Sequence, residues 1–382
     1  MSESQHLFNQ HIDRTRSHSI KWKKYQGKNI LPMWVADSDF RVPDVITNAL
    51  HTHVDHGIFG YGAAPASLTD VLVERMATHY NWHIQPEWIV YLPGLVSALN
   101  LAVRACTESH QAVISPTPIY PKFITAAQYA KRSLSLSPIT LQNERWVLDL
   151  EATKVPAESR LMLFCNPLNP GGTVSTRQEL ETLHGFAKKH DLIVCSDEIH
   201  CDLILNEQAR HIPFASLDED AAQRSITLIA PSKTFNIAGL GAAMAIIPNV
   251  ELRRRFNRVQ AGIVPDMNVL AYTATEAAYR EGQPWLTQQL NHLRQQRDRL
   301  IQAINAMPGL KLHPIEATYL AWIDASELPV DHPHAFFEAA GLGFSPGADF
   351  GQPDFVRMNF ACTSDTLTLA IDRMQRAIAS MG

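Results

Sequence analysis

Six short apolar runs alternate with helix-like stretches through the middle of the chain, at residues 88–92, 112–115, 161–165, 192–196, 226–230 and 242–247. Turn residues follow the runs, and segments such as residues 95–106 have helical hydrophobic spacing. Buried parallel strands are continuous apolar runs, and the connections between them are usually helices. The alternation therefore predicts an α/β fold with helices on both faces of a mostly parallel sheet.

At 382 residues the chain exceeds the length, about 250 to 300 residues, at which single cores stop growing. We expect an N-terminal arm over residues 1–40 that joins the small domain, a large domain over 41–282, and a small C-terminal α+β domain over 283–382. The region 251–307 reads as long and helical, with a break at Gly282.

Local signals predict further elements. A helix is expected to start near Pro43, and Thr176 and Glu179 have the spacing of a capping box that opens a helix toward His190. In the C-terminal part, alternating patterns predict strands within 319–324 and 355–361, and helices near 332–340 and 364–380.

The composition excludes several classes of protein. The net charge is −5 at pH 7 and no basic stripe is present, which argues against a nucleic-acid partner and against a regulatory DNA-binding protein. The longest uncharged apolar run, residues 238–248, is too short to span a membrane. The first residues lack a secretory pattern, so we expect a cytoplasmic protein.

Metal sites are not expected either. His51, His53 and His56 do not share one helical face, which favours a solvated surface. The cysteines form no C-x-x-C spacing and are predicted to be reduced thiols: Cys106, Cys165, Cys195, Cys201 and Cys362.

Five polar or turn residues each follow one of the apolar runs. They are Gly94, Tyr120, Asn169, Asp197 and Lys233. Because the carboxyl ends of parallel strands meet at one edge of a sheet, we expect these residues to lie together, and ligands bind at that edge in open α/β sheets.

Lys233 and Asp197 carry the strongest chemical signal. A lysine held away from water has a lowered amine pKa, and its neutral amine can attack a carbonyl to form an imine; pyridoxal 5'-phosphate is the common partner. A carboxylate that ends a buried strand needs a cation, and a protonated pyridine nitrogen is one. A surface lysine at a strand end is the alternative for Lys233.

The other candidates each have a structural alternative. Gly94, Leu95 and Val96 open a helix whose N-H groups can hold a phosphate, with Ser232 as a hydroxyl donor, or they form a plain turn. Tyr120 can stack on a flat ring or pack at the rim of the core.

Asn169 and Arg357 are candidates of the same kind. Asn169 can reach a ring oxygen with its amide, although Asn-Pro-Gly is also a turn sequence. Arg357 can bind an α-carboxylate with its planar fork, or it can form a structural ion pair.

Together these residues resemble the fold-type I pyridoxal-phosphate enzymes of the aminotransferase superfamily over essentially the whole chain. The resemblance is closer to the MalY/PatB branch of cystathionine β-lyases, also called cysteine-S-conjugate β-lyases. It rests on LPMWVAD (31–37), FGYG (59–62), CNPLNPGG (165–172), SDEIH (196–200), SKTFNIAGL (232–240), YLAWID (319–324) and RMNFA (357–361).

The resemblance implies a role for each residue. Lys233 would bind the cofactor covalently and later move the Cα proton, and Tyr61 would reach the phosphate of the other subunit of a homodimer. The implied cofactor-binding residues are Tyr61, Gly94, Leu95, Val96, Tyr120, Asn169, Asp197, His200, Ser232 and Lys233. The implied substrate-binding residues are Ala36, Tyr120, Asn169 and Arg357.

Three positions depart from the aminotransferase or branch patterns. Gly241 stands where many aminotransferases have an arginine, and His200 where they commonly have a tyrosine; both resemble the lyase branch. Ser38 replaces a methionine that is frequent in the branch, and the sequence gives no reason for it. The resemblance therefore implies β-elimination from L-cystathionine or related cysteine S-conjugates, with a class I/II aminotransferase as the alternative and the substrate left open.

Overall fold

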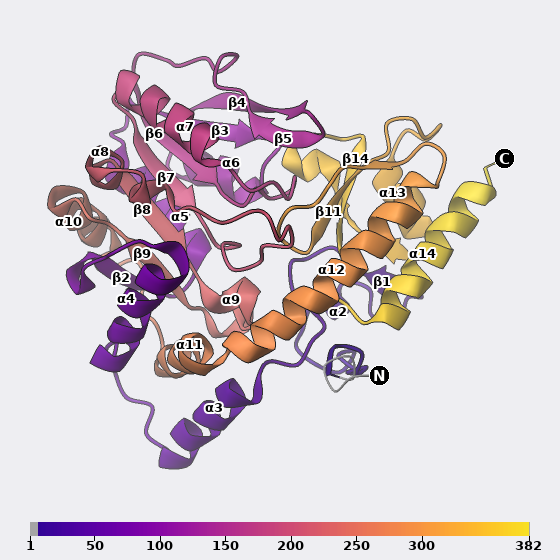
Figure 1. Ribbon diagram of the computed structural model, residues 1–382, viewed down its shortest axis with the longest axis horizontal. Coiled ribbons are helices and arrows are strands. Elements are labelled where there is room, and N and C mark those ends of the chain that lie inside the picture. Colours follow the sequence, from indigo (N-terminus) through magenta and orange to yellow (C-terminus); the bar gives the residue numbers. More distant parts are fainter. Residues whose placement is uncertain (1–6, 382) are drawn as a thin grey trace.

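The structure is a computed structural model that describes residues 7–381. An eight-stranded sheet forms its centre (Figure 1). Along the sheet the order is β2 (Ile89–Leu92), β9 (Ala243–Ile246), β8 (Ser225–Ile229), β7 (Ile193–Asp197), β6 (Ser159–Cys165), β3 (Ala112–Thr117), β4 (Ser133–Gln142) and β5 (Arg145–Leu148).

The pairing agrees with the expected architecture. The neighbours from β8 to β4 are parallel, β9 is antiparallel to both of its neighbours, and β5 is antiparallel to β4. All six apolar runs are strands, so the predicted mostly parallel α/β sheet is confirmed. The hairpin of β4 and β5 was not predicted, because β4 is half exposed and carries serines between its apolar residues.

Helices α5 (Leu95–Cys106), α6 (Pro121–Tyr129) and α10 (Val250–Gln260) cover one face of the sheet, and α7 (Arg177–Lys189) and α8 (Glu219–Gln223) cover the other. On β3, Val113 packs in the cluster with α5, α6 and α10, and the next residue, Ile114, packs in the cluster with α7 and α8. Successive strand residues point to opposite faces, so the two clusters are the two covered faces. The predicted capping box is present at the start of α7.

Four further helices lie outside these two layers: α3 (Asp44–His56), which begins after Pro43 as predicted, α4 (Ala66–Tyr80), α11 (Val269–Glu281) and α12 (Gln283–Asn305). The predicted break at Gly282 separates α11 from α12. The expectation of continuous helix before that break was wrong. Residues 261–268 leave the helix, since Gly262 has φ +75° and Pro265 cannot donate a backbone hydrogen bond.

The C-terminal part contains an antiparallel sheet in the order β10 (Lys311–Leu312), β11 (Leu320–Asp324), β14 (Phe355–Asn359) and β13 (Ser345–Pro346), with α13 (Pro333–Ala339) and α14 (Ser364–Ala379). From the N-terminal part, α2 (Ile20–Lys23) precedes β1 (Leu31–Pro32), which pairs in parallel with β12 (Leu342–Gly343). The N-terminal segment therefore lies beside the C-terminal third (Figure 1). The proposed domain boundaries stay predictions.

Short helical turns complete the fold: η1 (Pro86–Trp88), η2 (Phe214–Ser216), α9 (Pro231–Thr234), η3 (Ala238–Leu240) and η4 (Gly347–Phe350). None of the helices within residues 7–381 has both the length and the apolar surface needed to cross a membrane. In the same residues, no three His, Cys, Asp or Glu side chains are grouped so that they could hold a metal ion.

Candidate active site

A cavity of about 860 Å³ opens at the carboxyl ends of the parallel strands. It collects residues that follow five different strands and residues from the N- and C-terminal parts of the chain. Tyr61 lies outside it, fully exposed on the loop between α3 and α4. The other residues named from the sequence all line the cavity: Ala36, Gly94, Leu95, Val96, Tyr120, Asn169, Asp197, His200, Ser232, Lys233 and Arg357.

Lys233 lies on α9, the short turn that follows β8. Its Nζ donates a hydrogen bond to the backbone oxygen of Ala36 at 2.6 Å. Burial lowers the pKa of the Lys233 amine to about 8; nearby Asp37 opposes this shift and Arg357 adds to it. A substantial share of the amine is therefore neutral near pH 8, and a neutral amine can accept a proton.

Asp197 is the last residue of β7 and is 4% exposed. Its carboxylate accepts a hydrogen bond from the backbone N-H of Ile199 at 3.1 Å and forms no ion pair with any side chain in residues 7–381. Burial raises the pKa of this carboxyl from 3.8 to about 7. A buried carboxylate that lacks a cation and faces a cavity is suited to a cationic ligand atom.

His200 is also buried against the cavity, and its Nδ1 has no hydrogen-bond partner within the described part of the chain. Burial lowers the pKa of its imidazole to about 3, and the charges of Lys233 and Arg357 act in the same direction. The ring is therefore neutral at physiological pH and leaves one nitrogen available to a ligand.

Arg357, on β14, is oriented by neutral acceptors. Its Nη1 donates to Asn169 Oδ1 at 2.9 Å, and its Nη2 donates to the backbone oxygen of Trp34 at 2.9 Å and to Ser345 Oγ at 3.3 Å. The guanidinium also lies 4.6 Å from the centre of the Phe350 ring. Burial lowers its pKa to about 10, so it stays protonated at pH 7.

No anionic side chain among residues 7–381 pairs with Arg357, and its buried Nε has no partner. This leaves the guanidinium ready for a carboxylate from outside the chain. Because Asn169 Oδ1 faces the arginine, its Nδ2 is left to donate elsewhere. Sequence reasoning missed Trp34, Ser345 and Phe350, which contact Arg357. A buried arginine needs hydrogen-bond acceptors, but the sequence does not identify which residues provide them.

The part of the cavity lining at the start of α5 can hold an anion. Leu95 and Val96 are in the first turn of α5, where backbone N-H groups have no partner within the helix, and Ser232 lines the same cavity. Gly241 has φ +68°, and a Cβ there would lie 2.6 Å from the backbone oxygen of Pro93. This backbone therefore cannot carry an arginine at position 241 without moving.

These groups fit pyridoxal 5'-phosphate. Asp197 suits the protonated ring nitrogen, the unpartnered nitrogens of His200 and Asn169 are donors or acceptors beside the ring, and the start of α5 suits the phosphate. Lys233 has the amine that the aldehyde group requires.

Comparisons with known proteins agree with this fit. Residues 34–374 match the family described as aminotransferase class I and II. The chain is 35% identical to cystathionine β-lyase PatB of Bacillus subtilis (strain 168), over 97% of this chain and 100% of PatB. The crystal structure of OvoB is 55% identical with a TM-score of 0.96, over 98% of this chain and 99% of that one.

The crystal structure of cystalysin from Treponema denticola, which contains pyridoxal 5'-phosphate, is 31% identical with a TM-score of 0.94, over 98% of this chain and 99% of that one. Cofactor and fold type are thus shared with a solved relative. The chain belongs to the aminotransferase class I and II family, in the branch of cystathionine β-lyase PatB.

Proposed function

We propose that the protein is a pyridoxal-phosphate-dependent C–S β-lyase that acts on L-cystathionine or a related cysteine S-conjugate. The observation that carries this proposal is that Lys233, Asp197 and Arg357 line one cavity, in a chain related over 97% of its length to a cystathionine β-lyase. Water and the substrate are converted to a thiol, pyruvate and ammonia, and no keto acid is consumed.

Arg357 and Asn169 hold the substrate in this scheme. Two guanidinium N-H groups bind the α-carboxylate, and this places the Cα–H bond near the amine of Lys233. The backbone at Ala36 closes the cavity on the substrate side.

Lys233 then moves the proton. When bound, pyridoxal phosphate supplies an electron sink for the electron pair released from the Cα–H bond. The neutral amine of Lys233 takes the Cα proton, and the carboxylate of Asp197 would hold the protonated ring nitrogen of the cofactor. The thiolate leaves from Cβ and takes up a proton, and the released aminoacrylate hydrolyses to pyruvate and ammonia.

The direct test is to incubate the loaded protein with L-cystathionine without a keto acid and to follow pyruvate and free thiol together. Equal release of both is expected. If a keto acid were instead converted to its amino acid and no thiol appeared, the aminotransferase would be the correct function. S-alkyl cysteines and L-cystine tested beside cystathionine identify the preferred leaving group.

Replacing Arg357 with lysine is expected to raise KM for L-cystathionine by about 10- to 100-fold with a smaller change in kcat, because lysine cannot make the two-point contact to a carboxylate. Steady-state kinetics measure both constants. The matched control is Arg376→Lys, at an exposed arginine on α14. A variant in which kcat falls and KM is unchanged would contradict substrate binding by Arg357.

We further propose that the protein works as a homodimer in the cytoplasm. The loop between α3 and α4 runs along the outside of the molecule (Figure 1), and it exposes large apolar side chains: Ile58 (66%), Phe59 (56%) and Tyr61 (112%). Such a patch is typical of an interface, and Tyr61 would extend from it to the phosphate in the partner. The cysteines are free thiols, which suits a reducing compartment.

Mixing two inactive variants tests the shared site. Tyr61→Ala and Lys233→Ala are each expected to lose most activity, and random reassembly of the two should restore about a quarter of the wild-type activity, because half of the dimers then contain one complete site of two. Co-refolding in equal amounts followed by a pyruvate assay measures this. No recovery in a verified mixed dimer would mean that Tyr61 serves its own subunit or none.

A further inference from the structure

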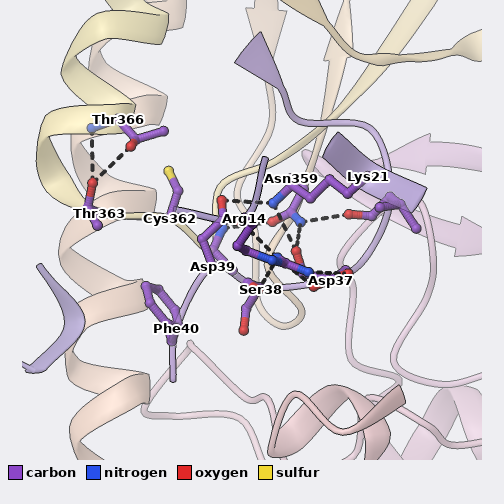
Figure 2. Close-up of polar contacts among 12 residues, drawn as sticks. Arg14, Lys21, Asp37, Ser38, Asp39, Phe40, Asn359, Cys362, Thr363 and Thr366 are labelled. Carbon is purple, nitrogen blue, oxygen red and sulfur yellow. Dashed lines mark hydrogen bonds and ion pairs between the residues drawn. The ribbon is translucent and has the colours of Figure 1, made fainter. Parts of the chain in front are cut away.

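Residues 35–40, whose backbone contacts Lys233 at Ala36, are held by a group of four charged residues. We name this group the arm clamp: Arg14, Lys21, Asp37 and Asp39 (Figure 2). Arg14 makes two contacts to the carboxylate of Asp37: Nη1 to Oδ1 and Nη2 to Oδ2, both at 3.0 Å. Its Nη1 also donates to Asp39 Oδ1 at 2.9 Å. Lys21, which is 1% exposed, donates to Asp39 Oδ2 at 2.8 Å and to the backbone oxygen of Asp37 at 3.0 Å.

Other parts of the fold fix the same backbone. Asn359 of β14 donates to the backbone oxygens of Val35 (2.7 Å) and Asp37 (2.9 Å), as Figure 2 shows for the second of these. Asn236, three residues after Lys233, donates to the backbone oxygens of Ser38 and Phe40 at 3.1 and 2.8 Å. Residues 35–40 are therefore held by the arm clamp, by Asn359 and by Asn236. Ala36, within this segment, accepts the hydrogen bond of Lys233.

The clamp also sets the charge that faces the amine. Four titratable or charged groups act on Lys233 or respond to it: Asp37 from the arm, Asp197 and His200 at the end of β7, and Arg357 from β14. Asp37 differs from the others because a second charge, Arg14, is bound directly to its carboxylate.

We propose that Arg14 is a positioning residue that neutralises Asp37 and thereby keeps the Lys233 amine in its neutral, proton-accepting form. The inference rests on the proposed role of Lys233. Asp37 raises the pKa of this amine against the larger effect of burial. With Arg14 removed, the whole negative charge of Asp37 would act on the amine and favour its protonated form.

The test measures the titration of Lys233 in the full-length chain freed of cofactor, from the pH dependence of its modification by an amine-selective reagent. Arg14→Met is expected to move the midpoint upward by about half a unit or more, and Asp37→Asn to move it downward. The double variant should return close to the wild type, and Arg14→Lys should stay near it because the positive charge remains. The matched control is Arg41→Met, which removes an exposed arginine that follows this segment and lies 3.6 Å from the carboxylate of Asp44.

In the cofactor-loaded enzyme the substrate amine must first displace the Lys233 amine, so the acidic limb of kcat against pH should shift in the same direction. A midpoint in Arg14→Met that is unchanged or lower would overturn the inference, as would a double variant that behaves like Arg14→Met, because loss of the arm structure would then explain the effect. The midpoint is read without turnover. Failure of the proposed lyase function would instead appear as wild-type protein that releases no pyruvate.

Discussion

Replacing Lys233 with alanine is expected to lower the rate of pyruvate release from L-cystathionine by about 10⁴-fold, because the variant has no group that can accept the Cα proton. The backbone oxygen of Ala36 contacts the present amine at 2.6 Å and cannot take over this role, since a carbonyl oxygen is a very weak base. The measurement is the initial rate of pyruvate and thiol release at saturating pyridoxal phosphate.

Two further experiments separate chemistry from folding in this variant. A small primary amine such as methylamine should restore part of the rate in Lys233→Ala, because it can enter the vacated space and accept the proton. Lys188→Ala, at an exposed lysine of α7, is the matched control and should keep the wild-type rate. Full turnover by Lys233→Ala would refute the mechanism, whereas a variant that fails to bind the cofactor would show only that the lysine is needed for assembly.

One physical reason allowed the sequence to predict the central sheet and part of the cavity lining. In a parallel sheet the carboxyl ends of the strands meet at one edge, so a residue that follows a strand can be placed without knowing any loop. Tyr120, Asn169, Asp197 and Lys233 were all brought together in this way. The prediction used only the order of strands and turns.

The features of the site that the sequence did not predict depend on contacts between distant parts of the chain. Arg357 is oriented by Trp34, more than 300 residues earlier, and by Ser345, and no local pattern identifies such partners. The arm clamp joins two basic residues to two acidic residues that individually resemble ordinary surface charges. Tyr61 is fully exposed and lies outside the cavity of its own chain, so its proposed contact with a second subunit stays a prediction.

Replacing Asp197 with asparagine is expected to lower kcat by about 10²-fold or more, because an amide cannot keep the ring nitrogen protonated and the electron sink is weakened. The side chain keeps its shape, so the hydrogen bond from Ile199 can persist and the cavity should stay intact. Single-turnover rates of thiol release in the loaded variant measure the effect. A kcat that stays within a few-fold of the wild type would contradict a role beside the ring.

Unfolding temperatures distinguish a role of Asp197 beside the cofactor ring from a purely structural role. Burial raises the pKa of Asp197 from 3.8 to about 7, so its ionised form destabilises the folded, cofactor-free protein. The effect is absent below about pH 4, grows as the pH rises toward 7 and is constant above that. Cofactor-free Asp197→Asn should therefore unfold at the same temperature as the wild type near pH 4 and at a higher temperature than the wild type at pH 8. Loading with pyridoxal phosphate should stabilise the wild type more than it stabilises Asp197→Asn.

Asp202→Asn is the contrasting control. Asp202 is a buried carboxylate that is already paired with Arg75 at 2.5 Å and accepts a hydrogen bond from Thr234. Removing its charge leaves a buried guanidinium uncompensated, so we expect a loss of about 3–5 kcal/mol in the free energy of unfolding. If Asp197→Asn lost stability in the same way at pH 8, Asp197 would be a structural carboxylate. If Asp197→Asn is stable but inactive, the cation that pairs with the Asp197 carboxylate in the working enzyme belongs to the cofactor.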